Sequence, residues 1–345
     1  MHPFFCPSLA QNMTSNPSLA TVFPLNSLSV FEAKGQDALT FLQGQLTNDI
    51  VAPGIGQSRL AGYCTAQGRL LATMVLGQVP DTEEMPTVRG IMRADILTAV
   101  LKRLSMFVLR AKVSLRAEAL HVAGVCKHSS HLEAMVAALG HPLPLAEWET
   151  FYTSTGTWIA APSALSHTLD SEALRRWWWI AGSEHITAIE KLKLGWTQGE
   201  AASWDCMDIQ AGLPWIEART QDLFIPQTLN LELIGGVSFT KGCYPGQEIV
   251  ARSHYRGTVK KRMALGQLVP NCDPAPLPGS DIFDASQPGQ ACGRLINVST
   301  TEAEGESAQW VLFESSFEAY DRQQLRAVDD KGPAIETVAL PYTTR

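Results

Sequence analysis

The sequence has 345 residues, of which 45% are hydrophobic and 18% charged, and its formal net charge is −7. These values are typical of a globular chain with two or three compact units. The negative charge disfavours a general binder of nucleic acids or membrane surfaces, because phosphate contacts need clustered Lys and Arg. We therefore expect no direct nucleic-acid partner and no membrane. One local basic cluster suits a small anionic ligand better than a polymer: Arg252, Arg256, Lys260, Lys261 and Arg262.

The N-terminal region contains no Lys or Arg before Lys34, and prolines interrupt its apolar pieces. A secretory signal needs a basic start and a continuous apolar core. Moreover, no stretch approaches the ~20 apolar residues of a membrane span. We therefore expect a cytoplasmic protein in which residues 1–24 form a flexible extension, with Met13 as an alternative start.

The seven cysteines are scattered, with no C-x-x-C pair and no histidine partner at metal-ligand spacing. An odd, scattered set in a cytoplasmic protein favours reduced thiols. The same pattern disfavours a metal site or an iron–sulfur cluster held by this chain alone.

The first ~185 residues mix helical and strand patterns, which predicts an α+β region. Two β-rich runs flank Gln67-Gly68 and predict a hairpin. In "RRWWW", strand alternation places Trp177 and Trp179 on one face and Trp178 on the other, which favours core packing over a nucleic-acid or cation–π site. The apolar spacing predicts helices over 36–49, 91–109, 131–139 and 186–207, strands over 112–125 and 156–162, and a short helix running into a strand over 171–182.

Beyond residue 262, short β-like runs alternate with Gly and Pro turns, which predicts a small antiparallel barrel or sandwich. We place the domain boundary at residue 263. The expected organisation is thus an α+β region of two interleaved subdomains over 25–262, followed by a C-terminal β-barrel over 263–345.

The stretch "SFTKGCYPGQEIVAR", residues 238–252, carries the densest set of reactive side chains. Its glycines permit a tight turn, and Pro245 suits the first turn of a helix. Cys243 would then lie just before a helix N-terminus, where a thiolate is favoured, with Lys241 and Arg252 adding positive charge. The pattern equally fits a helix-starting turn with a cysteine that only packs.

A longer stretch, "FIPQTLNLELIGGVSFTKGCYPGQEIVARSHYRGTVKKR", resembles the signature of the folate-binding YgfZ-type family, a branch of the aminomethyltransferase superfamily tied to iron–sulfur cluster maturation. "FLQGQLTNDI", "YCTAQGRLLA" and "AGLPWI" match weaker family blocks. The resemblance implies a three-part ring around a site for tetrahydrofolate or a derivative. It also implies cluster assembly or repair in client enzymes, including a tRNA methylthiotransferase. It assigns chemistry to Cys243 and Lys241, and folate contacts to Gln210, Tyr244, Gln247, Glu248 and Arg252.

The parent superfamily's aminomethyl transfer uses an acidic residue after a hairpin, and the matching stretch here is "GRLLAT", residues 68–73. The acidic positions fall on Ala72 and Thr73, and no Asp or Glu occurs between Asp49 and Asp81. The superfamily's pterin-reading glutamate is replaced by Gln210. Because an amide cannot act as a base at neutral pH, the resemblance supports a folate site and disfavours aminomethyl transfer.

Three hypotheses follow. The first is a folate-dependent maturation factor whose thiol acts on a client cluster. The second is a folate-dependent one-carbon transferase, which the missing carboxylates disfavour. The third is a non-catalytic scaffold that holds folate as a structural ligand, and the sequence does not separate it from the first.

Overall fold

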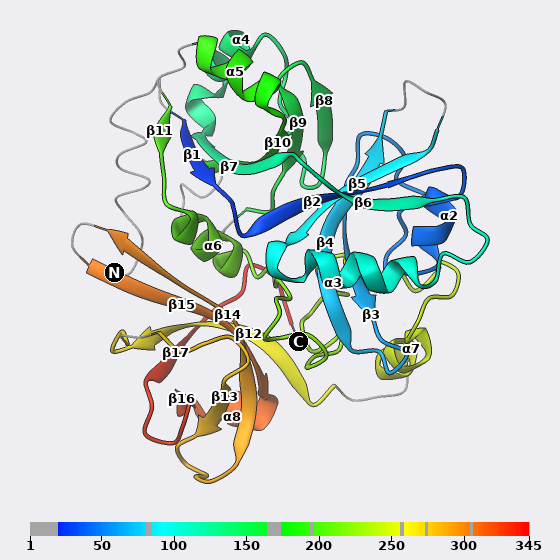
Figure 1. Ribbon diagram of the computed structural model, residues 1–345. Helices are drawn as coiled ribbons and strands as arrows, with labels where there is room; N and C mark the ends of the chain where they lie inside the picture. Colours follow the sequence, from blue (N-terminus) through cyan, green and yellow to red (C-terminus); the bar gives the residue numbers. More distant parts are fainter. Residues whose placement is uncertain are drawn as a thin grey trace.

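The protein folds into three parts that meet at the centre of the molecule (Figure 1), two sheets with their helices and a C-terminal barrel. This arrangement confirms the predicted α+β fold with a C-terminal antiparallel β-barrel. Residues 1–19 of the predicted extension, and Arg256, lie outside the part of the chain that the structure describes. The computed structural model describes residues 20–80, 85–163, 174–192, 196–255, 259–272, 275–303 and 306–344.

The first part is an antiparallel five-stranded sheet. The predicted hairpin is present: β3 and β4 pair from Arg59 opposite Leu76 to Cys64 opposite Leu70, and Gly68 lies in the turn between them. In spatial order the strands are β3 (Arg59–Cys64), β4 (Leu70–Val79), β5 (Thr87–Arg93), β2 (Leu28–Lys34) and β6 (Ser114–Glu118).

The second part is a six-stranded sheet that takes its first strand from the start of the described chain. Thr21–Pro24 pairs with two strands and buries Phe23, so the flexible extension predicted over 1–24 is wrong for these residues. In spatial order the strands are β11 (Thr197–Gln198), β1 (Thr21–Pro24), β7 (His121–His128), β10 (Leu174–Ala181), β9 (Gly156–Ala160) and β8 (Thr150–Thr153).

The third part is a closed six-stranded barrel whose first strand starts at Lys261, beside the predicted boundary at 263. Its side chains divide between two cores: Val311 and Phe313 fill the barrel, whereas Trp310 and Leu312 join the core of the preceding parts. This alternation follows from the two-residue period of a strand. Around the barrel the strands are β12 (Lys261–Val269), β15 (Glu306–Ser316), β14 (Ala291–Ala303), β13 (Asp281–Asp284), β16 (Leu325–Ala327) and β17 (Ala334–Val338).

The helices lie against or between these sheets (Figure 1). The longest, α3, buries one apolar face and keeps Lys102 and Arg103 in its last turn, where cations interact favourably with the helix dipole. The helical segments are α2 (Ala38–Gln43), α3 (Ala94–Ser105), the short 3-10 helix η1 (Ser129–His131), α4 (Leu132–Leu139), α5 (Ser183–Lys191), α6 (Ala201–Gln210), α7 (Gln247–Tyr255) and α8 (Phe317–Arg322). None of the helices in the described ranges has the length and apolar content that a bilayer crossing requires.

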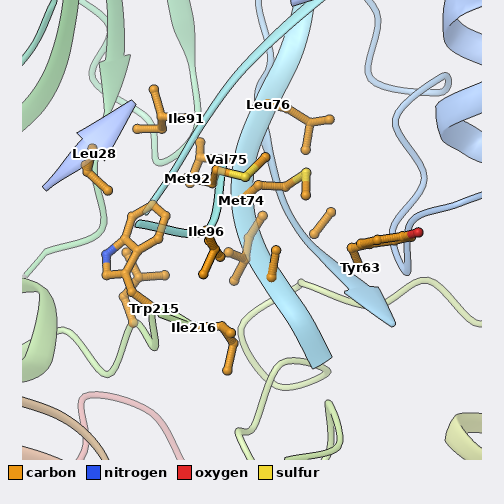
Figure 2. Close-up of a cluster of buried hydrophobic side chains, with 14 of the residues drawn as sticks. Leu28, Tyr63, Met74, Val75, Leu76, Ile91, Met92, Ile96, Trp215 and Ile216 are labelled. Carbon is orange, nitrogen blue, oxygen red and sulfur yellow. The ribbon is translucent and has the colours of Figure 1, made fainter. Parts of the chain in front are cut away.

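The loop after α6 joins the largest core. Figure 2 shows Trp215 and Ile216 beside Ile96 of α3, in one cluster with Met74 and Val75 of β4. The predicted tryptophan alternation is also confirmed, because Trp177 and Trp179 pack in one core and Trp178 in the other. These shared cores hold the loop between α6 and α7 in place, and that loop carries much of the candidate site.

Several predicted elements are wrong in extent. The helix predicted over 186–207 is split into α5, the strand β11 and α6, because Thr197 and Gln198 pair with β1 and Gly199 donates to Val22 O at 2.8 Å. The single strand predicted over 112–125 is two strands, β6 and β7, in different sheets. In each case pairing with a distant strand overrides the local pattern.

Candidate functional site

The predicted turn before α7 packs directly on the β3–β4 hairpin. Gly246 has φ +81°, and a Cβ there would lie 2.5 Å from Thr65 O and 2.6 Å from the Cα of Gly68. The helix begins at Gln247, whose N–H donates to Tyr244 O at 3.1 Å. Pro245 therefore lies in the turn before the helix. The prediction that it occupies the first helical turn is wrong. The close approach brings the block "KGCYPGQE" into contact with the block "YCTAQGRLLA", which lies far from it in the sequence.

This contact gives a stability prediction. Gly246→Ala should lower the free energy of unfolding by about 1–3 kcal/mol, because alanine is strained at positive φ and its Cβ would collide with backbone atoms. Gly242→Ala is the matched control, since a Cβ at Gly242 meets nothing within 4 Å. Urea unfolding of both variants measures the difference. Equal stability of the two variants would contradict the packing described here.

Lys241 anchors the motif to the first part of the chain. Its side chain is buried, and Nζ donates to the carbonyl oxygens of Gln43 and Leu46, the latter at 2.5 Å. These carbonyls lie at and just beyond the C-terminal end of α2, where a cation also interacts favourably with the helix dipole. Burial lowers the pKa of Lys241 to about 8, while the charges of Asp49 and Cys243 oppose this shift.

Cys243 stands out among the cysteines. Of those in the described part of the chain, it alone is exposed: Cys64, Cys126 and Cys206 are buried, and Cys272 and Cys292 are half-buried. Cys243 also lies close enough to Lys241 to influence its pKa. The loop therefore presents a thiol to solvent beside a buried amine.

Arg252 pairs with a carboxylate, whereas the sequence suggested that its charge would favour the Cys243 thiolate. It donates to Glu248 at 2.8 Å, and both side chains are largely exposed. Two further cations of the predicted basic cluster are also paired, Lys261 with Glu314 and Arg262 with Glu232. Three cations of the cluster, Arg252, Lys261 and Arg262, are therefore held in separate ion pairs, and Lys241 lies beside the thiol.

The seven predicted site residues fall in two places. Gln210 ends α6, which packs against the barrel strands β14 and β15, whereas α7 packs on the β3–β4 turn (Figure 1). Tyr244 follows Cys243 in the loop before α7, residues 241–246, which we call the thiol loop; its side chain is buried, and burial raises the pKa of its hydroxyl. Gln247 is half-buried and Glu248 exposed at the start of α7. The structure thus separates Gln210 from the other six.

A cavity of about 280 Å³ lies next to the Gln210 block. Its walls come from distant chain segments: Ala211 and Leu213 of "QAGLPW", the loop before the thiol motif, the loops before β8 and after β9, and the C-terminal tail. Tyr342 of the tail donates to Gly212 O at 3.0 Å and so ties the tail to this block. The lining residues are Glu147, Trp148, Pro162, Ser163, Ala211, Leu213, Leu233, Ile234, Pro341 and Tyr342.

Trp148 is the strained residue of this cavity. It has φ +67°, a conformation that is rare for a bulky side chain. Its backbone is held from both sheets: its O accepts from Ser58 N at 2.8 Å, and its N donates to Ala160 O at 2.9 Å. Strain that surrounding structure enforces is frequent at ligand sites. Neither Trp148 nor Tyr342 belongs to a motif, so the sequence gives no signal for either.

The two positions at which the sequence resemblance would place an acidic residue, Ala72 and Thr73, hold structural residues. Thr73 is fully buried; its hydroxyl donates to Pro214 O at 3.0 Å and accepts from Ile216 N at 2.9 Å. Ala72 is buried as well. Because neither side chain can take up a proton, this stretch holds the 214–216 loop and offers no general base.

No protein-family model matches the chain. A curated relative named tRNA-modifying protein YgfZ, from Yersinia pestis (strain Pestoides F), is 28% identical over 346 residues, which cover 99% of this chain and 98% of that protein. The YgfZ-named protein of Yersinia enterocolitica (serotype O:8 / biotype 1B) is 28% identical over 336 residues, 96% of this chain and 95% of its own. Among solved structures, glycine cleavage system aminomethyltransferase T from Bartonella henselae superposes with a TM-score of 0.67 at 14% identity, covering 94% of this chain and 87% of that one. The resemblance in the sequence is thereby confirmed: the chain is related to the YgfZ-named proteins along nearly its whole length and has an aminomethyltransferase fold.

Proposed function

We propose that the protein binds tetrahydrofolate, or a derivative, and assists the assembly or repair of iron–sulfur clusters in client enzymes, including a tRNA methylthiotransferase. The exposed thiol of Cys243 beside the buried amine of Lys241 is the observation that carries this proposal. The names of the relatives, which describe tRNA-modifying proteins, support a link to tRNA modification.

The donor set of the cavity fits the pterin end of a folate. A pterin is flat, with apolar faces and a polar edge, and such ligands are held by aromatic walls and a few polar groups. Trp148 and Tyr342 supply aromatic surface, and Glu147 and Ser163 supply polar groups. Gln210, which precedes the lining residue Ala211 in the chain, would add an amide at the edge of this site. Folate bound there would supply one-carbon or redox chemistry, while these residues bind and orient it.

Cys243 would act on the client. A cysteine thiolate is an iron ligand, and an exposed one can reach a cluster held by another protein. The loop 233–241 connects the two places, because Leu233 and Ile234 line the cavity and Lys241 anchors the thiol loop. Aminomethyl transfer is disfavoured, because the buried Thr73 and Ala72 offer no base.

Calorimetry with tetrahydrofolate tests the ligand. The unmodified protein should bind it, and Leu233→Trp, which adds bulk at the cavity wall, should weaken binding by about tenfold or more. Leu277→Trp is the matched control, because Leu277 is a similarly exposed leucine outside the cavity. Absence of binding at millimolar tetrahydrofolate would overturn the folate proposal. Robust cleavage of an aminomethyl-lipoyl substrate would instead support the transferase.

A further inference from the structure

The connection between α3 and β6 exposes large apolar side chains in close succession. Leu109 is 87% exposed, Met106 62% and Phe107 46%. The large apolar residues of α3 itself are buried, so the exposure of large apolar side chains is confined to the segment that follows the helix. Grouped apolar exposure of this kind marks interaction surfaces in soluble proteins.

The same segment is positively charged in a protein of net charge −7. Lys102, Arg103, Arg110 and Lys112 are all exposed. Lys112 donates to Gln36 at 3.1 Å, and neither Lys102 nor Arg110 forms an ion pair with any residue in the described ranges. Their charges therefore remain available to a negatively charged partner.

Contacts link this segment to the thiol loop. Burial raises the pKa of Tyr63 of β3, and the charge of the nearby Arg103 opposes that shift. Tyr63 forms a backbone bridge with Leu46, whose carbonyl accepts from Lys241. In Figure 1 the α3–β6 connection and α7 lie at the same side of the molecule, to the right of the view. A large partner seated on the segment would thus lie at the side of the molecule that carries the Cys243 loop.

We propose that residues 102–112 are the docking surface for the iron–sulfur client enzyme, which binds through a patch of acidic and apolar side chains; this inference rests on the proposed function. Charge complementarity selects an acidic partner. Two of the three exposed apolar residues, Leu109 and Met106, are aliphatic and offer no ring for base stacking, which favours a protein over RNA. The apolar residues also follow α3 instead of forming a helix face, which disfavours a membrane surface.

Binding of purified tRNA methylthiotransferase to the immobilised protein tests the surface. Leu109→Ser should weaken binding by about tenfold, and Lys102→Glu with Arg110→Glu by about tenfold or more, the latter effect shrinking as salt rises. The matched controls are Leu277→Ser and Lys331→Glu, which are exposed positions in the C-terminal part of the chain and should bind like the unmodified protein.

The outcomes separate this inference from the proposed function. If Cys243→Ser fails to complement a strain lacking the protein while the surface variants bind and complement normally, the docking surface is overturned and the function stands. Failure of the unmodified protein to bind the methylthiotransferase overturns the docking proposal as well. Equal losses of binding in the surface variants and in their controls would also overturn the docking proposal. Tight binding of bulk tRNA or of anionic phospholipid vesicles, lost in the same variants, would assign the surface to those partners instead.

Discussion

Cys243→Ser is expected to abolish complementation of a strain that lacks the protein while leaving the free energy of unfolding nearly unchanged. The side chain is exposed, so replacing sulfur by oxygen removes little packing, and surface changes are usually worth less than ~0.5 kcal/mol. A serine hydroxyl stays protonated at neutral pH and is a poor iron ligand, so the chemistry proposed for the thiol is lost.

The other cysteines of the described chain provide the control. Burial raises the pKa of Cys64 and of Cys126 to about 12, and it also raises the pKa of the half-buried Cys292. Since the thiolate is the nucleophile, Cys243 should alkylate about tenfold faster than Cys292 at neutral pH. Cys292→Ser should complement normally. Should Cys243 alkylate no faster than Cys292, and Cys243→Ser complement fully, the motif is only a helix-starting turn.

The parts of the fold that the sequence predicted are those set by local pattern. The hairpin around Gly68 and the two faces of the tryptophan strand follow from alternation over a few residues. The start of α7 follows from the glycine and proline before it, although the first helical residue is Gln247 and not Pro245. Each of these signals acts within one element.

The parts that could not be predicted depend on contacts between distant segments. Lys241 binds carbonyls almost two hundred residues away, and backbone carbonyls leave no mark in a sequence. The cavity takes Trp148 from a loop before β8 and Tyr342 from the tail, positions that no motif joins. The sequence therefore found the thiol loop, but neither what holds it nor where the cavity lies.

A buried ion pair between the second sheet and α6 gives the largest expected effect on stability. Asp208 pairs with Arg176 of β10 and accepts from Trp215 Nε1 at 2.9 Å, and both charged side chains are almost wholly buried. The Arg176 guanidinium also lies over the Trp204 ring, 4.4 Å from its centroid. Burial raises the pKa of Asp208, and the Arg176 charge opposes that shift.

Asp208→Ala should lower the free energy of unfolding by about 3–5 kcal/mol, because it leaves a buried guanidinium without its counter-charge. In the described part of the chain, Nε and Nη1 of Arg176 have no hydrogen-bond partner that could compensate. Asp205→Ala is a matched control on the same helix, since its partner Arg93 keeps Glu217 at 3.3 Å. The control should lose clearly less stability in urea unfolding.

The double variant Arg176→Met with Asp208→Leu distinguishes the stability lost with the ion pair from the stability lost when one buried charge is left unpaired. Replacing both charges by apolar side chains of similar size should restore much of the stability, because desolvation of the ions no longer opposes folding. The loss of the Trp215 bond would remain, and Trp215 lies on the loop that follows the cavity residues Ala211 and Leu213. We therefore expect the double variant to fold yet bind tetrahydrofolate more weakly than the unmodified protein. A double variant no more stable than Asp208→Ala would show that the pair itself, and not the unpaired charge, accounts for the loss.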